Sequence, residues 1–190
     1  EIKETESSQF LDRIRNDFLG LNTKYRIANG EETRRIYLDS TASTLMMGIA
    51  HRTSEKFLKH YSNTHSLMHF SAKIATKTYA WVHERMLEFV HADSEHYTCF
   101  FTGSGTTSGM NRIARIFNNL QPKKDIVLVS IMEHHSNDLP HRKHGGHVIH
   151  IPVDTHESKM GCVDMDLLEH FLREYEGRVN YVSITGISNV

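Results

Sequence analysis

A glycine-threonine turn, Gly103-Ser104-Gly105-Thr106-Thr107, offers the clearest site for chemistry in the sequence. It stands between an apolar segment at 97–101 and a segment at 110–117 whose apolar residues have helical spacing. A turn that opens a helix presents backbone N–H groups without intrahelical acceptors, and the helix dipole adds positive potential. Glycines allow an anion to approach closely and threonine hydroxyls add hydrogen bonds, so the turn predicts a phosphate site. The alternative is an ordinary helix cap, which uses the same N–H groups.

The turn differs from two other phosphate-binding patterns. No Gly-Lys-Ser/Thr follows it, so it is not a Walker A loop. The third glycine of a dinucleotide fingerprint is misplaced, and no fitting acidic strand end follows. The phosphate that the turn would hold therefore belongs to another class of ligand.

A second pattern with chemical potential is a histidine tract, in which His141, His144, His147 and His150 recur every three residues. Histidine-rich tracts bind zinc. However, Gly145-Gly146 breaks the segment, and alternation in a strand sends His147 and His150 to opposite faces. Four tetrahedral ligands would not converge easily, so we predict no specific metal site.

The elements that position these residues alternate between helices and strands. Helices are predicted over 5–20, 44–60, 71–91, the segment after the glycine turn, and 164–175; strands are predicted over 35–39, 97–101, 126–129, 147–153 and 179–184. Such alternation implies right-handed crossovers and a largely parallel sheet. Sheets of this kind bind ligands at the carboxyl ends of their strands. The glycine turn, a loop at 133–137 and the pair Ser188-Asn189 all follow strands, so we expect them at that edge.

Composition sets wider bounds. The 190 residues are 38% hydrophobic and 24% charged, which is enough for one sizeable core. A formal net charge of -1 gives no general attraction to nucleic acid or an anionic membrane, and the apolar runs are too short for a transmembrane helix. Two cysteines make no disulfide framework, so we expect a cytoplasmic protein. The start lacks Met, so we expect the true N-terminus to be missing, and the last strand leads into a loop, which predicts a chain truncated at its C-terminal end.

Five motifs, in this order along the chain, resemble the class V aminotransferases and cysteine desulfurases. They are residues 37–43, 61–66, 101–107, 132–137 and 187–190. The resemblance implies a pyridoxal 5'-phosphate-dependent enzyme of fold type I, an α/β fold with a three-layer αβα large domain and a mostly parallel sheet. We expect residues 1–33 to form an N-terminal helical arm and residues 34–190 to form the first part of the pyridoxal-phosphate-binding large domain.

The resemblance also implies roles for single residues. Gly105, Thr106 and Thr107 would hold the cofactor phosphate, with Thr107 as the side-chain ligand. His134 would stack on the pyridine ring, and as the catalytic residue it would move protons at the substrate carbon, because imidazole titrates near neutral pH. Asn189 would donate its amide N–H to the phenolic oxygen of the ring.

Other positions carry weaker implications. His65 and Ala42 would line the substrate side, although an ordinary polar loop residue is an equal alternative for His65. Asp39 is interpreted as a structural strand end. We expect the lysine that forms the imine and the aspartate that faces the pyridine nitrogen beyond the last residue. Any persulfide cysteine is expected there too, since Cys99 and Cys162 do not match the persulfide position.

The function implied is cysteine desulfurase-like cleavage of a C–S bond in an amino acid. A class V aminotransferase or another amino-acid lyase remains an alternative, as does a non-catalytic truncated relative that binds phosphate or a partner. The expected partners are a small amino-acid substrate and a second copy of the chain in a homodimer, with neither nucleic acid nor membrane.

Overall fold

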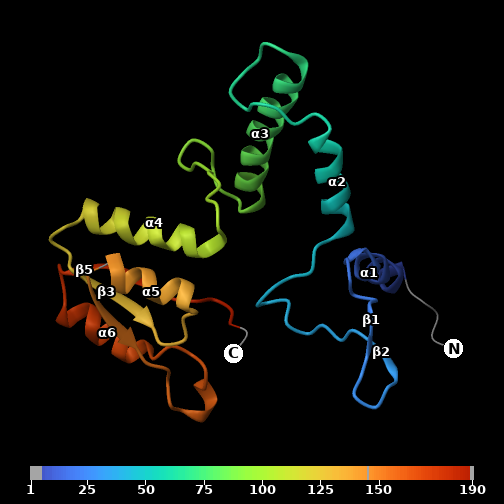
Figure 1. Ribbon diagram of the computed structural model, residues 1–190. Helices are drawn as coiled ribbons and strands as arrows, with labels where there is room; N and C mark the ends of the chain where they lie inside the picture. Colours follow the sequence, from blue (N-terminus) through green and yellow to red (C-terminus); the bar gives the residue numbers. More distant parts are fainter. Residues whose placement is uncertain (1–5, 145, 189–190) are drawn as a thin grey trace. The chain divides into compact units, whose positions relative to one another are not determined.

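The computed structural model describes residues 6–144 and 146–188, and the chain divides after Phe100 into two compact units (Figure 1). The elements of the first unit are α1 (Glu6–Asp17), β1 (Lys24–Arg26), β2 (Glu32–Arg34), α2 (Gly48–Leu58) and α3 (Phe70–Phe89). Those of the second unit are α4 (Gly105–Leu120), β3 (Ile126–Ser130), α5 (His135–His144), β4 (His147–Ile151), the 3-10 helix η1 (Glu157–Lys159), α6 (Met165–Glu174) and β5 (Val179–Ser183). Among the described residues, no helix is long and apolar enough to cross a bilayer.

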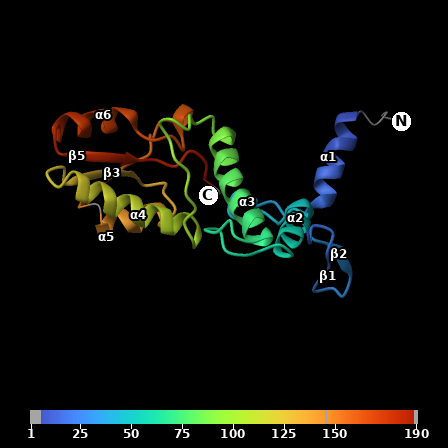
Figure 2. The ribbon, with the colours of Figure 1, turned by 90° about the horizontal axis from the view of Figure 1, so that it is seen from above.

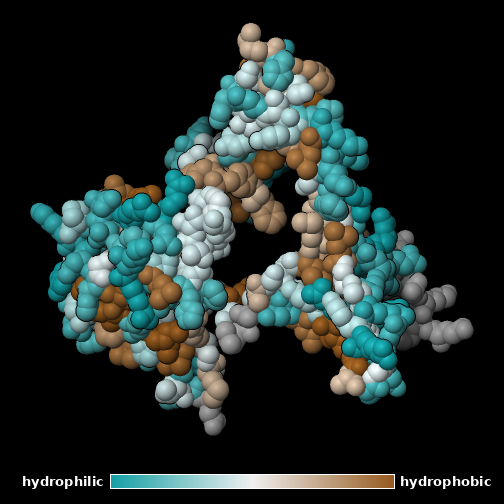
Figure 3. Space-filling view, viewed as in Figure 1, coloured by the Kyte–Doolittle hydropathy of each residue, from teal (hydrophilic) through white to brown (hydrophobic). Residues whose placement is uncertain are grey.

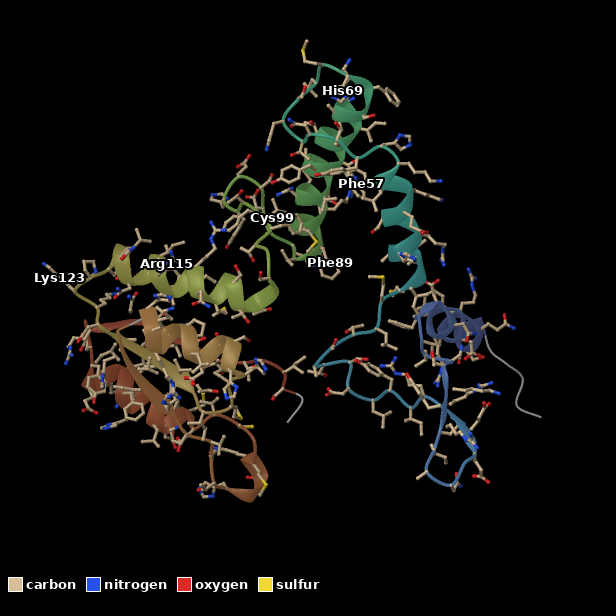
Figure 4. The ribbon with its side chains drawn as sticks, viewed as in Figure 1. Phe57, His69, Phe89, Cys99, Arg115 and Lys123 are labelled. Atoms are coloured by element: carbon tan, nitrogen blue, oxygen red, sulfur yellow. The ribbon has the colours of Figure 1, made fainter. Side chains whose placement is uncertain are left out.

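In the first unit, short-range hydrogen bonds hold the β1–β2 hairpin and the start of α3. β1 and β2 pair antiparallel around a turn in which Gly30 has a φ of +87°. His69 is the N-cap residue that precedes α3, and its Nδ1 accepts a hydrogen bond from the Ala72 N–H at 3.3 Å (Figure 4). The Thr76 hydroxyl donates to the Ser66 carbonyl at 3.0 Å, which ties the loop before α3 to that helix.

The second unit is a parallel three-stranded sheet with helices on both faces, a partial three-layer αβα arrangement. The strand order is β4-β3-β5, and β3 pairs in parallel with both neighbours. α6 covers one face, and α4 and α5 lie side by side on the other (Figure 2). Each parallel neighbour is reached through a helix, because strands that run in the same direction need a crossover.

The core of the second unit lies on the two faces of β3, whose 5 residues are all buried. On the α6 face, Ile126 and Leu128 pack with Ile151 of β4 and Leu168 of α6. On the opposite face, the ring of Tyr181 contacts Phe117 of α4, with 5.0 Å between ring centroids. The continuous apolar run at 126–129 therefore reflects burial on both sides, as expected for a central parallel strand.

Large hydrophobic side chains also reach the surface of each unit (Figure 3). On α3, Phe70 and Phe89 are 72% and 79% exposed, and Trp81 is 53% exposed. Within the described residues, these three aromatic rings of α3 therefore remain largely uncovered.

The sequence predicted most elements to within a few residues, but it was wrong about two strands. Residues 35–39 and 97–101 form no strand; β2 lies earlier, at Glu32–Arg34. An apolar run becomes a strand only where a neighbour supplies hydrogen-bond partners, and within the described residues the sheet consists of β3, β4 and β5. The segment at 133–137, expected as a loop, continues into α5, whose polar composition and internal Pro140 obscure the helical pattern.

Gly146, between α5 and β4, is a backbone position that requires glycine. Its φ is +96°, and an added Cβ would lie 2.5 Å from the Asp125 carbonyl oxygen. Gly146→Ala is therefore expected to lower the free energy of unfolding by about 1–2 kcal/mol for the left-handed conformation and by about 1–3 kcal/mol more for the clash. Urea denaturation measures the loss. Gly177→Ala is the matched control, since Gly177 has a φ of +77° and open space around it; equal losses in the two variants would contradict the role of the Asp125 contact.

Candidate functional site

The glycine-threonine turn lies where α4 begins, and no side chain caps the helix there. Ser104 stands at the N-cap position with a φ of 62°, and its side chain makes no capping hydrogen bond. Gly105 follows with a φ of +67°. A Cβ added at Gly103 or Gly105 would meet no atom within 4 Å. The start of α4 thus has open space beside its glycines and no side-chain cap, which is the arrangement that can accept an anion.

A pocket between α4 and α5 brings the turn and the histidine motif together. It has a volume of about 260 Å³, and its lining includes Thr107 and Asn111 from α4 and His134 and Lys143 from the α5 side. A shallower pocket of about 630 Å³ adjoins it and shares Thr107, Asn111 and Lys143. Three further basic side chains line that second pocket: Arg112, Arg115 and His144. Both pockets therefore suit a ligand that carries negative charge.

The ring of His134 is exposed, and hydrogen bonds fix its tilt. Its Nδ1 accepts a hydrogen bond from the Ser136 N–H at 3.1 Å and lies 2.9 Å from the Ser136 hydroxyl. The Ser136 amide belongs to the first turn of α5, so His134 caps that helix with its side chain. Because Nδ1 accepts, we assign the ring proton to Nε2. The neighbouring His135 is also exposed, with 6.0 Å between the two ring centroids.

Behind His134, a network of polar side chains joins α5 to the sheet. The Glu133 carboxylate accepts hydrogen bonds from the Ser130 hydroxyl and the Asn137 amide. Asn137 Oδ1 in turn lies 3.1 Å from Nε2 of His141, and Nδ1 of His141 lies 2.9 Å from the Tyr181 hydroxyl. Burial raises the pKa of Tyr181 to about 12. The hydroxyl therefore stays protonated and donates a hydrogen bond to Nδ1 of His141.

A second group of charges fixes α5 to β4. Asp138, which is 8% exposed, accepts hydrogen bonds from Arg142 and from Nε2 of His150. Burial of this carboxyl acts to raise its pKa, but the bonds from Arg142 and His150 outweigh burial and hold the pKa below its ordinary value. His150 is thus a structural group in this cluster, as His141 is in the network with Asn137 and Tyr181. Within residues 6–144 and 146–188, no cluster of three or more His, Cys, Asp or Glu side chains is arranged to hold a metal ion.

His141 is fully buried, and desolvation lowers its pKa from the ordinary value of 6.5. The unfolded chain therefore binds a proton at higher pH than the folded chain does. The contribution of neutral His141 to the free energy of unfolding is complete above pH 6.5. It is lost as the pH falls toward the pKa of the folded state, and the free energy of unfolding then changes by up to about 1.4 kcal/mol per pH unit. His141→Gln is expected to remove this slope between pH 7 and 5 in urea denaturation. His147→Gln, at an exposed position, should keep it; an unchanged slope in His141→Gln contradicts the prediction.

The structure places the other predicted site residues as follows. Gly105 and Thr106 are exposed in the first turn of α4, next to Thr107. Ala42 and His65 lie in the first unit, where the Ala42 N–H donates to Asp39 and the His65 N–H donates to Asn63. Asn189 lies outside the described residues. The roles assigned to all of these residues stay predictions.

Two features of the site were not predicted from the sequence. Lys143 lines the pocket with Thr107 and His134, because α5 packs against α4, and no local motif signals this contact. Glu133 and Asn137 belong to the network behind His134, and their place beside the histidine in the Glu-His-His-Ser-Asn motif was the available signal. Lys123 lies after α4, at the opposite end of that helix from the turn (Figure 4).

Comparisons with known proteins agree on one family and one fold. The family described as aminotransferase class-V has a model that matches residues 36–190. A cysteine desulfurase from Klebsiella pneumoniae (strain 342) is 28% identical over 186 residues, which are 95% of this chain and 42% of that protein. One from Dickeya dadantii (strain 3937) is 30% identical over the same shares. The chain thus spans about two fifths of the length of the curated relatives it matches.

Solved structures show the fold. The apo structure of a cysteine desulfurase from Thermococcus onnurineus NA1 is similar with a TM-score of 0.72 at 23% identity, over 94% of this chain and 40% of that one. The cysteine desulfurase CsdA from Escherichia coli gives a TM-score of 0.54 at 22% identity, over 89% of this chain and 39% of that one. The chain therefore has the fold of the corresponding part of these proteins.

Proposed function

Because the chain belongs to the aminotransferase class-V family, we propose that it forms part of a pyridoxal-phosphate-dependent enzyme that cleaves the C–S bond of an amino acid. The observation that carries this proposal is the pocket lined by both Thr107 and His134. Thr107 suits the phosphate of the cofactor, and His134 suits its ring. The names of the relatives favour cysteine as the substrate.

The residues of the pocket fit the two ends of the cofactor. The uncapped N–H groups at Gly105, Thr106 and Thr107, with the Thr107 hydroxyl, would hold the phosphate, and Lys143 adds positive charge beside them. The exposed ring of His134 would lie against the pyridine ring, which buries apolar area and fixes the ring tilt. Asn189 would donate to the phenolic oxygen.

When bound, the cofactor supplies an electron sink for negative charge at the substrate carbon. The role of this chain would be to hold and orient the cofactor and to move a proton. Nδ1 of His134 accepts from Ser136 and the ring proton lies on Nε2, so Nε2 would be the atom that donates a proton to the substrate carbon. Ala42 and His65 are proposed on the substrate side.

We also propose that the enzyme is a cytoplasmic homodimer. The exposed aromatic side chains of α3 are of the kind that subunit interfaces cover. Cys99 and Cys162 are free thiols, which fits a reducing compartment. The domain division that we propose is an arm at 1–33 and the first part of the large cofactor-binding domain at 34–190.

The test uses the full protein that carries this chain, loaded with pyridoxal phosphate and supplied with L-cysteine and a thiol. Desulfuration converts one cysteine and two thiols to one alanine, one sulfide and one disulfide, and we expect alanine and sulfide in equal amounts. An aminotransferase would instead convert cysteine to its keto acid when an amino acceptor is present. A protein that binds the cofactor with neither outcome would be a lyase for another amino acid or a non-catalytic relative, and one that leaves the visible absorption of the cofactor unchanged contradicts the proposal.

A further inference from the structure

The Glu133 carboxylate lies where three segments of the second unit meet. Its Oε1 accepts a hydrogen bond from the Ser130 hydroxyl, at the end of β3, at 2.8 Å. The same oxygen accepts from the Thr185 backbone N–H, just after β5, at 2.5 Å. Its Oε2 accepts from the Asn137 side-chain amide, in the first turn of α5. One side chain therefore joins the ends of two neighbouring strands to the helix that begins at the histidine motif.

The orientation of Asn137 is fixed by its other contacts. Its Oδ1 accepts from the Ser183 hydroxyl at 2.9 Å and from Nε2 of His141 at 3.1 Å. The Tyr181 hydroxyl donates to Nδ1 of His141, so the ring proton of His141 lies on Nε2, which donates to Asn137. With its oxygen committed to two donors, Asn137 turns its NH₂ group toward Glu133. The network thus has a single direction of hydrogen bonding, which ends on a carboxylate that only accepts.

We propose that Glu133 is a positioning residue that holds His134 and the segment at 184–188 in one arrangement. His134 is its direct neighbour in the chain, and Thr185 lies just after the end of β5. One carboxylate therefore fixes both the start of the histidine motif and the described residues that follow β5. This inference rests on the proposed function for the identity of the ligand, but the positioning is a property of the chain itself.

The direction of the network makes an isosteric change informative. In Glu133→Gln, an NH₂ group replaces Oε2 and meets the NH₂ of Asn137, and Asn137 is not free to rotate. In Asn137→Asp, two carboxylates face each other. In the double variant Glu133→Gln/Asn137→Asp, the introduced glutamine donates to the introduced aspartate, while the bonds to Ser130, Thr185 and Ser183 keep their donors and acceptors. The double variant therefore restores the geometry that each single change breaks.

The experiment measures amide hydrogen exchange and pyridoxal phosphate affinity in the full protein. Each single variant is expected to speed exchange at the Thr185 N–H by about 10-fold, since the part-buried hydrogen bond between Asn137 and Glu133 is lost and Glu133 is held less firmly, and to weaken cofactor binding by about 10-fold. Both effects should reverse in the double variant. The Leu128 N–H in β3 should keep its rate, because the loosening is local. Glu169→Gln is the control, as Glu169 is an exposed residue of α6 that pairs with Arg173.

Three results would overturn the proposal: unchanged Thr185 exchange in the single variants, equal acceleration at Leu128, or a double variant as defective as the single ones. A failure of the proposed function gives a different pattern. In that case the unmodified protein does not bind pyridoxal phosphate, while the exchange rates still change and recover as described, and the positioning role of Glu133 stands.

Discussion

Replacing His134 with alanine is expected to lower the turnover of the full protein by about 10²- to 10⁴-fold, which is the usual contribution of a positioned acid or base. The change removes the ring that would stack on the cofactor and the Nε2 atom that would move the proton. It also removes the cap of α5, because Nδ1 accepts from the Ser136 N–H. Steady-state kinetics with L-cysteine measures the loss, and a cofactor titration shows how much of it comes from binding.

Two further variants separate these three roles. His134→Asn keeps a capping acceptor but lacks the ring, so helix stability should be preserved while turnover falls. His134→Phe keeps a flat ring but has no titratable nitrogen, so the cofactor should bind while turnover falls. Full turnover in His134→Phe would show that the imidazole moves no proton, and normal cofactor affinity in His134→Asn would show that the ring makes no stacking contact.

Replacing Gly105 with valine is expected to weaken pyridoxal phosphate binding by at least about 100-fold, equivalent to roughly 2.7 kcal/mol. Gly105 has a φ of +67°, and its neighbourhood is the open space in which the phosphate would sit. A β-branched side chain resists this backbone conformation and fills that space. Fluorescence titration with pyridoxal phosphate measures the affinity.

Gly103→Ala is the matched control for the turn. An added Cβ there meets no atom within 4 Å, and the conformation of Gly103 is open to other residues. Stability should therefore stay near that of the unmodified protein, in contrast to Gly105→Val, which should lose about 1–2 kcal/mol from the left-handed conformation alone. If Gly105→Val binds pyridoxal phosphate normally, the turn does not hold the phosphate.

The parts of the fold that could be predicted are those in which a short sequence carries its own signal. Ile126-Val127-Leu128-Val129 is apolar throughout and became the central strand, and the helix predicted over 164–175 formed as α6, with Leu168 and Phe171 against the core. The segment at 97–101 has the same composition as a strand, but the structure gives it none, because strand formation depends on a partner distant in the sequence.

The same distinction holds for the site. The glycine turn and His134 could be identified as candidates from local motifs, and the structure places Thr107 and His134 in one pocket. The network around Glu133 could not be predicted, since Asn137, His141 and Tyr181 meet only after α5 has packed on β5. Neither motif nor periodicity reveals which way an asparagine amide points; that orientation is decided by donors on α5 and β5.

The place of β3 in its sheet has a consequence for the newly made chain. β3 is synthesised before both strands that flank it, and the helix α6 that covers one of its faces is made between β4 and β5. Until the ribosome has completed residues up to Ser183, β3, the most apolar segment of the unit, lacks one of its neighbouring strands and remains partly exposed. Exposed strands of this kind are what chaperones bind and what aggregates nucleate on. We therefore expect chaperone contacts on the nascent chain to concentrate on residues 126–130 until β5 has emerged.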